Sequence, residues 1–92
     1  MRILVTPSFE RIAKKLHKQQ KVVLNETVRS IAAYPAIEEE KIGDLAGIRV
    51  YKFILSDQLI LLAYRFLNQD TIKLLTLGPH ENFYRDLKRL KP

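Results

Sequence analysis

Two stretches near the start of the chain have apolar residues three or four positions apart, the spacing of one face of an α-helix. The first stretch consists of Phe9, Ile12, Ala13 and Leu16. Thr6 can cap free helical N–H groups and Pro7 fits a first helical position, so we expect a helix to begin there. The second stretch consists of Leu24, Val28, Ile31 and Ala32. It predicts a helix over residues 21–34, ended by Pro35, and a short connection at residues 18–21 makes a helix hairpin.

Strands are expected where the composition is β-branched, aromatic or continuously apolar, at residues 2–6, 48–55, 59–67 and 71–77. In the second of these, apolar and polar residues alternate. Ile48, Val50 and Lys52 therefore face one side of the sheet, and Arg49, Tyr51 and Phe53 face the other. The third is mostly apolar and predicts a central strand. Turns are expected at residues 56–58 and 68–70.

The last part of the chain predicts a strand, a turn and a short helix. Gly78-Pro79 marks the turn, and the helix has Phe83, Leu87 and Leu90 at helical spacing. Residues 36–47, with Glu38-Glu39-Glu40, are interpreted as a solvated loop. The order β-α-α-β-β-β-α predicts an α+β fold with a twisted, mainly antiparallel sheet and the helix hairpin on one face. We expect a single domain over residues 1–92.

The charge and composition limit the class of partner. The formal charge is +6 and the pI about 9.8, which favours anionic partners such as nucleic acid. There is no cysteine, so thiolate chemistry and cysteine-based zinc sites are excluded, and a cytoplasmic protein is expected. No apolar run approaches the ~20 residues of a membrane span, and the first residues show no secretory signal pattern, so we expect neither a membrane-spanning segment nor a signal peptide. No metal-ligand cluster or glycine-rich phosphate loop is visible, so we expect no metal and no cofactor.

One corner of the predicted fold gathers side chains that can carry chemistry. His80 stands where the last strand gives way to the last helix, and Tyr84 follows one helical turn later. The same helix carries the basic residues Arg85, Lys88 and Arg89. Histidine can act as an acid or a base near neutral pH, and an aromatic ring can stack on an unpaired base.

The order of elements and several motifs together resemble the RelE/ParE superfamily of bacterial type II toxins, and within it the RelE and YafQ-like ribonucleases. The resemblance covers essentially the whole chain. Its carriers are Val5-Thr6-x-x-Phe9 and the runs at residues 45–53, 61–66 and 77–84. Most specific is Gly78-Pro79-His80 followed by Tyr84, because YafQ-like toxins end a strand with glycine, a small residue and histidine, and carry an aromatic residue four positions later.

This resemblance implies a small toxin that enters the ribosomal A site, cleaves messenger RNA and is held inactive by a cognate antitoxin protein. It makes His80 the catalytic histidine, Tyr84 the ring that orients the substrate and Arg49 the arginine that opens the second strand. Lys52 stands where YafQ-like toxins have another histidine. Their second-strand acidic residue has no counterpart here, since Ser56 stands at its spacing and Asp57 follows. These differences bring the chain closer to RelE itself, where basic groups do most of the work.

Metal-independent RNA cleavage uses the 2′-hydroxyl as nucleophile and needs a base, cationic donors for the phosphate and an acid for the leaving oxygen. We expect His80 to transfer a proton, Arg49 and Arg65 to stabilise the phosphate, and Tyr84 to stack on or orient the nucleotide. Lys52 is either a further phosphate contact or a proton donor. The residues expected to hold ribosomal RNA are Lys14, Lys15, Lys18, Arg85, Lys88 and Arg89. A position of Arg49 on the far side of the sheet from His80 would leave this pocket without its floor, and the nuclease assignment would then be abandoned.

Two other functions fit the same sequence. A ParE-like toxin that binds and inhibits DNA gyrase shares the fold and the charge, and the pair of His80 and Tyr84 is the feature that favours the nuclease. A basic binding module without chemistry is the other alternative, because the acidic residue is missing. Each residue also has a plain structural interpretation: His80 as a turn residue, Arg65 as an exposed strand residue, Tyr84 as the rim of the core, and the helix lysines as a solvated face.

Overall fold

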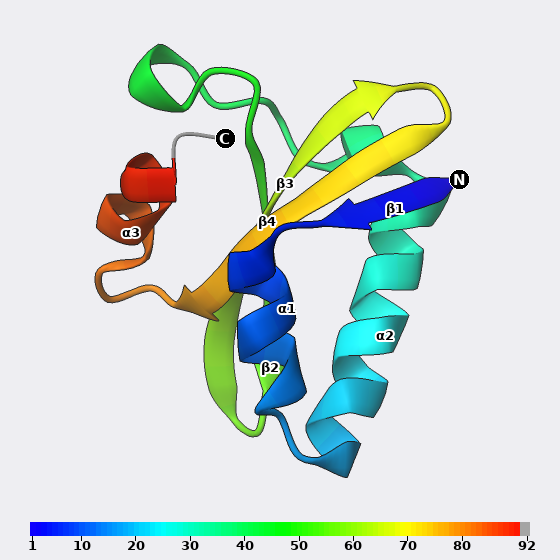
Figure 1. Ribbon diagram of the computed structural model, residues 1–92, viewed down its shortest axis with the longest axis vertical. Coiled ribbons are helices and arrows are strands. Elements are labelled where there is room, and N and C mark those ends of the chain that lie inside the picture. Colours follow the sequence, from blue (N-terminus) through cyan, green and yellow to red (C-terminus); the bar gives the residue numbers. More distant parts are fainter. Residues whose placement is uncertain (91–92) are drawn as a thin grey trace.

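The structure is a computed structural model that describes residues 1–90, and it has the order of helices and strands expected from the sequence (Figure 1). The elements are β1 (Arg2–Val5), α1 (Pro7–Lys14), α2 (Lys18–Ala33), β2 (Arg49–Leu55), β3 (Gln58–Asn68), β4 (Thr71–Pro79) and α3 (Phe83–Leu90), with 3₁₀ turns at Pro35–Ile37 and Gly43–Leu45. No helix within residues 1–90 is both long enough and apolar enough to cross a bilayer.

The four strands form one sheet in the order β1-β4-β3-β2. β1 runs parallel to β4, while β3 is antiparallel to both β4 and β2. The expected mainly antiparallel sheet is therefore confirmed. β3 lies between β4 and β2, and its residues Leu61 to Tyr64 are fully buried, as expected for a central strand.

Each face of the sheet has its own core. On one, which we call the hairpin face, Phe9 of α1 and Leu24 and Ile31 of α2 cluster with Leu62 and Tyr64 of the sheet. On the other, which we call the α3 face, the buried cluster consists of Ile48, Val50, Leu61, Ala63, Leu75, Phe83 and Leu87. The hairpin is confirmed on one face, and α3 lies against the other.

The start of α1 is fixed by Thr6, as the sequence predicts. Its hydroxyl accepts the N–H of Phe9 at 3.0 Å and donates to the carbonyl of Leu75 at 2.5 Å, which ties the helix start to β4. α2 begins three residues earlier than expected, at Lys18. The Gln20 side chain accepts the N–H of His17 at 3.2 Å, and this contact supplies the helix start that the apolar spacing did not reveal.

Two turns differ from the sequence prediction. The β2–β3 turn has two residues rather than three, Ser56 and Asp57, both left-handed with φ of 50° and 65°. Gly78-Pro79 is not a turn but the end of β4, where Pro79 pairs with Ile60. Proline is tolerated there because β1 pairs with β4 only as far as Leu74, so β4 has an open edge beyond it. The chain turns instead before α3, at Asn82, whose φ is 64°.

Candidate functional site

The corner between β4 and α3 holds two rings in contact. The imidazole of His80 meets the ring of Tyr84 edge-on, with centroids 5.8 Å apart and planes at 74°. Tyr84 also meets Phe83 edge-on at 5.3 Å and packs against the buried cluster of the α3 face. The His80 carbonyl accepts the N–H of Phe83 at 3.1 Å, which fixes the histidine to the start of the helix. The result is an exposed imidazole beside a half-buried phenol.

A lysine that the sequence analysis left in a solvated loop joins this pair. The ammonium nitrogen of Lys41 lies 5.7 Å from the centroid of the Tyr84 ring, a cation–π distance. The Lys41 N–H donates to the carbonyl of Ile48 at 2.7 Å, so the residue is held against the start of β2. Neither periodicity nor a motif signals this contact, because it depends on where residues 38–48 lie in the fold.

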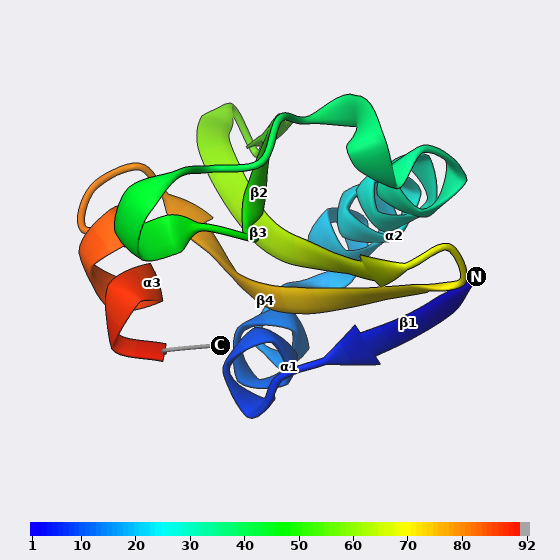
Figure 2. The same cartoon turned by 90° about the horizontal axis from the view of Figure 1, so that it is seen from above.

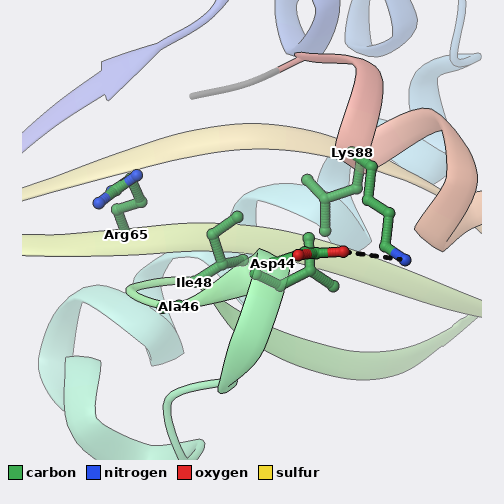
Figure 3. A pocket seen from close by; sticks show the side chains of 7 residues that line it. Asp44, Ala46, Ile48, Arg65 and Lys88 are labelled. Carbon is green, nitrogen blue, oxygen red and sulfur yellow. Dashed lines mark ion pairs between the residues drawn. The ribbon is translucent and has the colours of Figure 1, made fainter.

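Beside the corner, the turn Gly43–Leu45 and α3 enclose a pocket of about 430 Å³ on the α3 face. Lys88 and Asp44, which both line it, form an ion pair at 3.8 Å, and Arg65 lies at the end away from Lys88 (Figure 3). The guanidinium of Arg65 approaches Gly47, where a Cβ atom would stand 2.8 Å from its Nη2. The lining residues are Asp44, Leu45, Ala46, Ile48, Arg65, Leu87 and Lys88.

Arg49 does not belong to this site, so the prediction that it shares a pocket with His80 is wrong. Its guanidinium lies 6.0 Å from the ring of Phe66, which packs on the hairpin face, and its cross-strand partner Tyr64 is buried on the same face. The reason is strand alternation, because Arg49 and Val50 are neighbours and Val50 faces α3. Arg49 instead donates to the carbonyl of Glu38 at 2.5 Å and pairs with Glu40 at 3.9 Å.

The other expected catalytic residues lie on the α3 face. Lys52 is exposed and shares the parity of Val50 within β2, so it points to that face. Lys52 pairs across the sheet with Leu61 of β3, and Leu61 pairs with Gly78 of β4. Gly78 is two residues before His80 in the chain. Arg65 lines the pocket described above, and its neighbour Tyr64 is buried on the opposite face. Lys52, Arg65, His80 and Tyr84 are therefore on one side of the sheet.

The six basic residues expected to hold RNA are divided between two surfaces. Arg85, Lys88 and Arg89 are exposed on α3. Lys14 and Lys15 are exposed at the end of α1, with Lys14 paired to Glu10 at 3.4 Å, and Lys18 begins α2. Within residues 1–90 no group of three histidine, aspartate or glutamate side chains could hold a metal ion.

Comparison with solved structures defines the class of fold. A mutant of the E. coli toxin RelE in the free state superimposes with a TM-score of 0.69 at 14% identity, covering 98% of this chain and 92% of that one. The isolated E. coli RelE toxin gives 0.64 at 17% identity, covering 97% of each chain. A chain of the intact E. coli RelBE toxin-antitoxin complex gives 0.66 at 16% identity, covering 85% of this chain and 94% of that one. The fold is that of RelE.

The sequence gives the family. Residues 3–88 match the model of the ParE-like toxins of type II bacterial toxin-antitoxin systems, which is nearly the whole chain. The chain belongs to this family. A sequence comparison with curated proteins gives no match.

Proposed function

We propose that this toxin is an endoribonuclease that cleaves messenger RNA on the ribosome and so inhibits translation in the cytoplasm. The observation that carries the proposal is the corner where His80, an exposed imidazole, meets the ring of Tyr84 at 5.8 Å on a cationic surface. An imidazole can supply one of the proton transfers that metal-independent cleavage by the 2′-hydroxyl requires, and the neighbouring ring can hold the nucleotide by stacking on its base.

The proposal no longer includes Arg49. The nuclease assignment that used Arg49 as the floor of the pocket is abandoned, because Arg49 lies on the hairpin face of the sheet beside Phe66. In the revised form, the 2′-oxygen gives up its proton and attacks the adjacent phosphorus, and the bond to the 5′-oxygen breaks as that oxygen gains a proton, which leaves a 2′,3′-cyclic phosphate and a 5′-hydroxyl. His80 carries out one of the two proton transfers and solvent water the other. Lys52 and Arg65, on the α3 face, stabilise the negative charge that develops on the phosphate.

A cognate antitoxin is the second part of the proposal. The family is defined by toxin-antitoxin pairs, and the RelE fold is found in a toxin-antitoxin complex from E. coli. The net charge of +6 suits an acidic antitoxin segment. Co-expression with the neighbouring open reading frame should give a stable complex, and separate elution of the two proteins would count against this partner.

The nuclease is tested by the same substitution at both histidines. His80→Asn removes the imidazole that is proposed to transfer the proton and should lower cleavage of ribosome-bound mRNA by about 10²–10⁴-fold. His17→Asn, at the start of α2, is the matched control and should cleave like the wild type. Mapping of mRNA 5′ ends by primer extension after induction supplies the readout. Cleavage undiminished in His80→Asn would remove His80 from the mechanism.

Inhibition of DNA gyrase without nuclease activity is the second candidate. Two observations favour it: the matching family is the ParE-like toxins, and Arg49 lies on the face of the sheet opposite the corner. The same induction experiment separates the two functions, since intact mRNA together with broken DNA would support gyrase inhibition and overturn the nuclease.

A further inference from the structure

The segment between α2 and β2 crosses from the hairpin end of the molecule to α3, where it makes two contacts. Figure 2 shows it, in green, running from the end of α2 to the side of α3. Lys41 lies over the ring of Tyr84 at 5.7 Å, and Asp44 pairs with Lys88 at 3.8 Å. The segment therefore forms one wall of the candidate site.

The same segment is anchored from the opposite face of the sheet. Arg49 donates to the Glu38 carbonyl at 2.5 Å and lies 3.9 Å from the carboxylate of Glu40. The hydroxyl of Tyr64, which is fully buried, donates to the carbonyl of Pro35 at 2.7 Å. All three acceptors precede Lys41 by one to six residues, so the two side chains fix the path by which the chain reaches Tyr84.

The arginine side chain suits this anchoring role. A guanidinium has a planar fork of donors, so one side chain can bond a backbone carbonyl and a carboxylate together. Only 18% of the Arg49 side chain is exposed, and the Phe66 ring lies 6.0 Å from its guanidinium carbon. The main chain adds the bond from Lys41 to Ile48 at 2.7 Å, directly before Arg49. Movement of Arg49 would therefore loosen the segment that holds Lys41 beside Tyr84.

We propose that Lys41 binds a phosphate group of the RNA substrate, and that Arg49 is a positioning residue that holds Lys41 in place from the other face of the sheet. The proposal rests on the ribonuclease function above and adds to it a binding residue outside the expected set. An ammonium over Tyr84 can donate to a phosphate oxygen while the attached base stacks on the same ring. Arg49 contributes through the backbone of the segment and touches no substrate.

The role of Lys41 is tested with three variants on purified ribosomes carrying mRNA. Lys41→Met should slow single-turnover cleavage about 10–100-fold, the size expected for one hydrogen bond to a charged group, while Lys41→Arg should retain most of the rate. Lys21→Met, an exposed lysine on α2, is the matched control and should leave the rate unchanged. Lys41→Met should also reduce the salt dependence of binding by about one phosphate contact. A wild-type rate and a wild-type salt dependence in Lys41→Met would overturn the assignment.

The role of Arg49 is tested by combining substitutions. Arg49→Met should slow cleavage and speed hydrogen exchange of the Lys41 amide, whereas Lys41→Met should slow cleavage with that amide still protected. The double variant should be no slower than the slower single variant, because Arg49 acts through Lys41. Effects that multiply would overturn the positioning role. If Arg49→Met does not fold, Arg49→Lys is used in its place. It keeps the charge but lacks the planar fork of donors, so the same effects on cleavage and hydrogen exchange are expected to be smaller.

These results separate the inference from the function on which it rests. A wild-type protein that leaves ribosome-bound mRNA intact overturns both. A wild-type protein that cleaves, beside a Lys41→Met variant with an unchanged rate and an unchanged salt dependence, overturns the inference alone and leaves the nuclease in place.

Discussion

Tyr64 shows how one buried side chain fixes a segment distant in sequence. Burial raises the pKa of its phenol above the ordinary value of about 10, and the hydroxyl donates to Pro35 at 2.7 Å. Tyr64→Phe leaves that carbonyl without the bond, so the free energy of unfolding at pH 7 should fall by about 1–3 kcal/mol. Urea titration measures the change, and Tyr34→Phe, at an exposed position, is the matched control.

The raised pKa also gives this bond a pH dependence with a definite sign. The neutral phenol is favoured in the folded protein, so its contribution is complete below about pH 10, where the unfolded phenol is also neutral. As the pH rises further, the unfolded phenol ionises first and the contribution is lost as the folded pKa is approached. The difference in stability between wild type and Tyr64→Phe should therefore shrink above about pH 10. A difference in stability between wild type and Tyr64→Phe that stays constant above about pH 10 would contradict this prediction.

At this scale the sequence predicted some contacts and missed others. His80 and Tyr84 meet because four positions around the start of a helix bring side chains together, which is a local relation. Arg49 and Lys52 were assigned to one pocket although three positions along a strand put them on opposite faces. The alternation is visible in the sequence and separates the two residues, whereas only the resemblance to the toxin family places Arg49 beside His80.

At the scale of elements, the turn between β2 and β3 carries strain that its sequence does not relieve. Ser56 and Asp57 both adopt left-handed φ, the geometry of a two-residue turn that asparagine followed by glycine fits best. The double substitution Ser56→Asn with Asp57→Gly should raise the free energy of unfolding by about 1 kcal/mol, since each ordinary residue costs about 1–2 kcal/mol in that conformation. Thermal unfolding checks the gain.

Gln69→Gly in the next turn is the matched control for this change. Its φ is not positive, so glycine there brings only added freedom in the unfolded chain and should lower stability slightly. An equal gain from both changes would show that the stabilisation does not come from the left-handed geometry.

The elements themselves were predictable because each depends on local signals. Thr6 caps α1 as expected, and the apolar stripes of both helices pack on the sheet. The observed start of α2 and the observed end of β4 differ from the predicted ones because neither depends on apolar spacing. A side-chain bond of Gln20 fixes the start of α2, and Pro79 stays in β4 because β1 pairs with β4 only as far as Leu74. Residues 36–47 gave no periodic signal, since bonds to Arg49 and Tyr64 from distant strands fix their path.

At the scale of the whole molecule, the question is which surface the positive charge serves. Basic side chains are exposed both on α3 and at the ends of α1 and α2. Two double variants separate overall attraction from local contact: Arg85→Glu with Arg89→Glu on α3, and Lys14→Glu with Lys15→Glu on α1. Each lowers the net charge by four, from +6 to +2, so long-range attraction weakens to a similar extent in both.

More phosphate contacts should be lost in the α3 pair than in the α1 pair, because Tyr84 lies in α3 and His80 contacts it from the residues before that helix. We expect both variants to bind ribosomes carrying mRNA more weakly at low salt, and the α3 variant to bind more weakly still. Its affinity should also fall less steeply between roughly 50 and 200 mM salt. Each lost phosphate contact lowers the steepness of the plot of log affinity against log salt concentration by about 0.7–0.9. If the α1 variant shows the flatter slope instead, the RNA lies on the hairpin side, and a site built around His80 would not contact it.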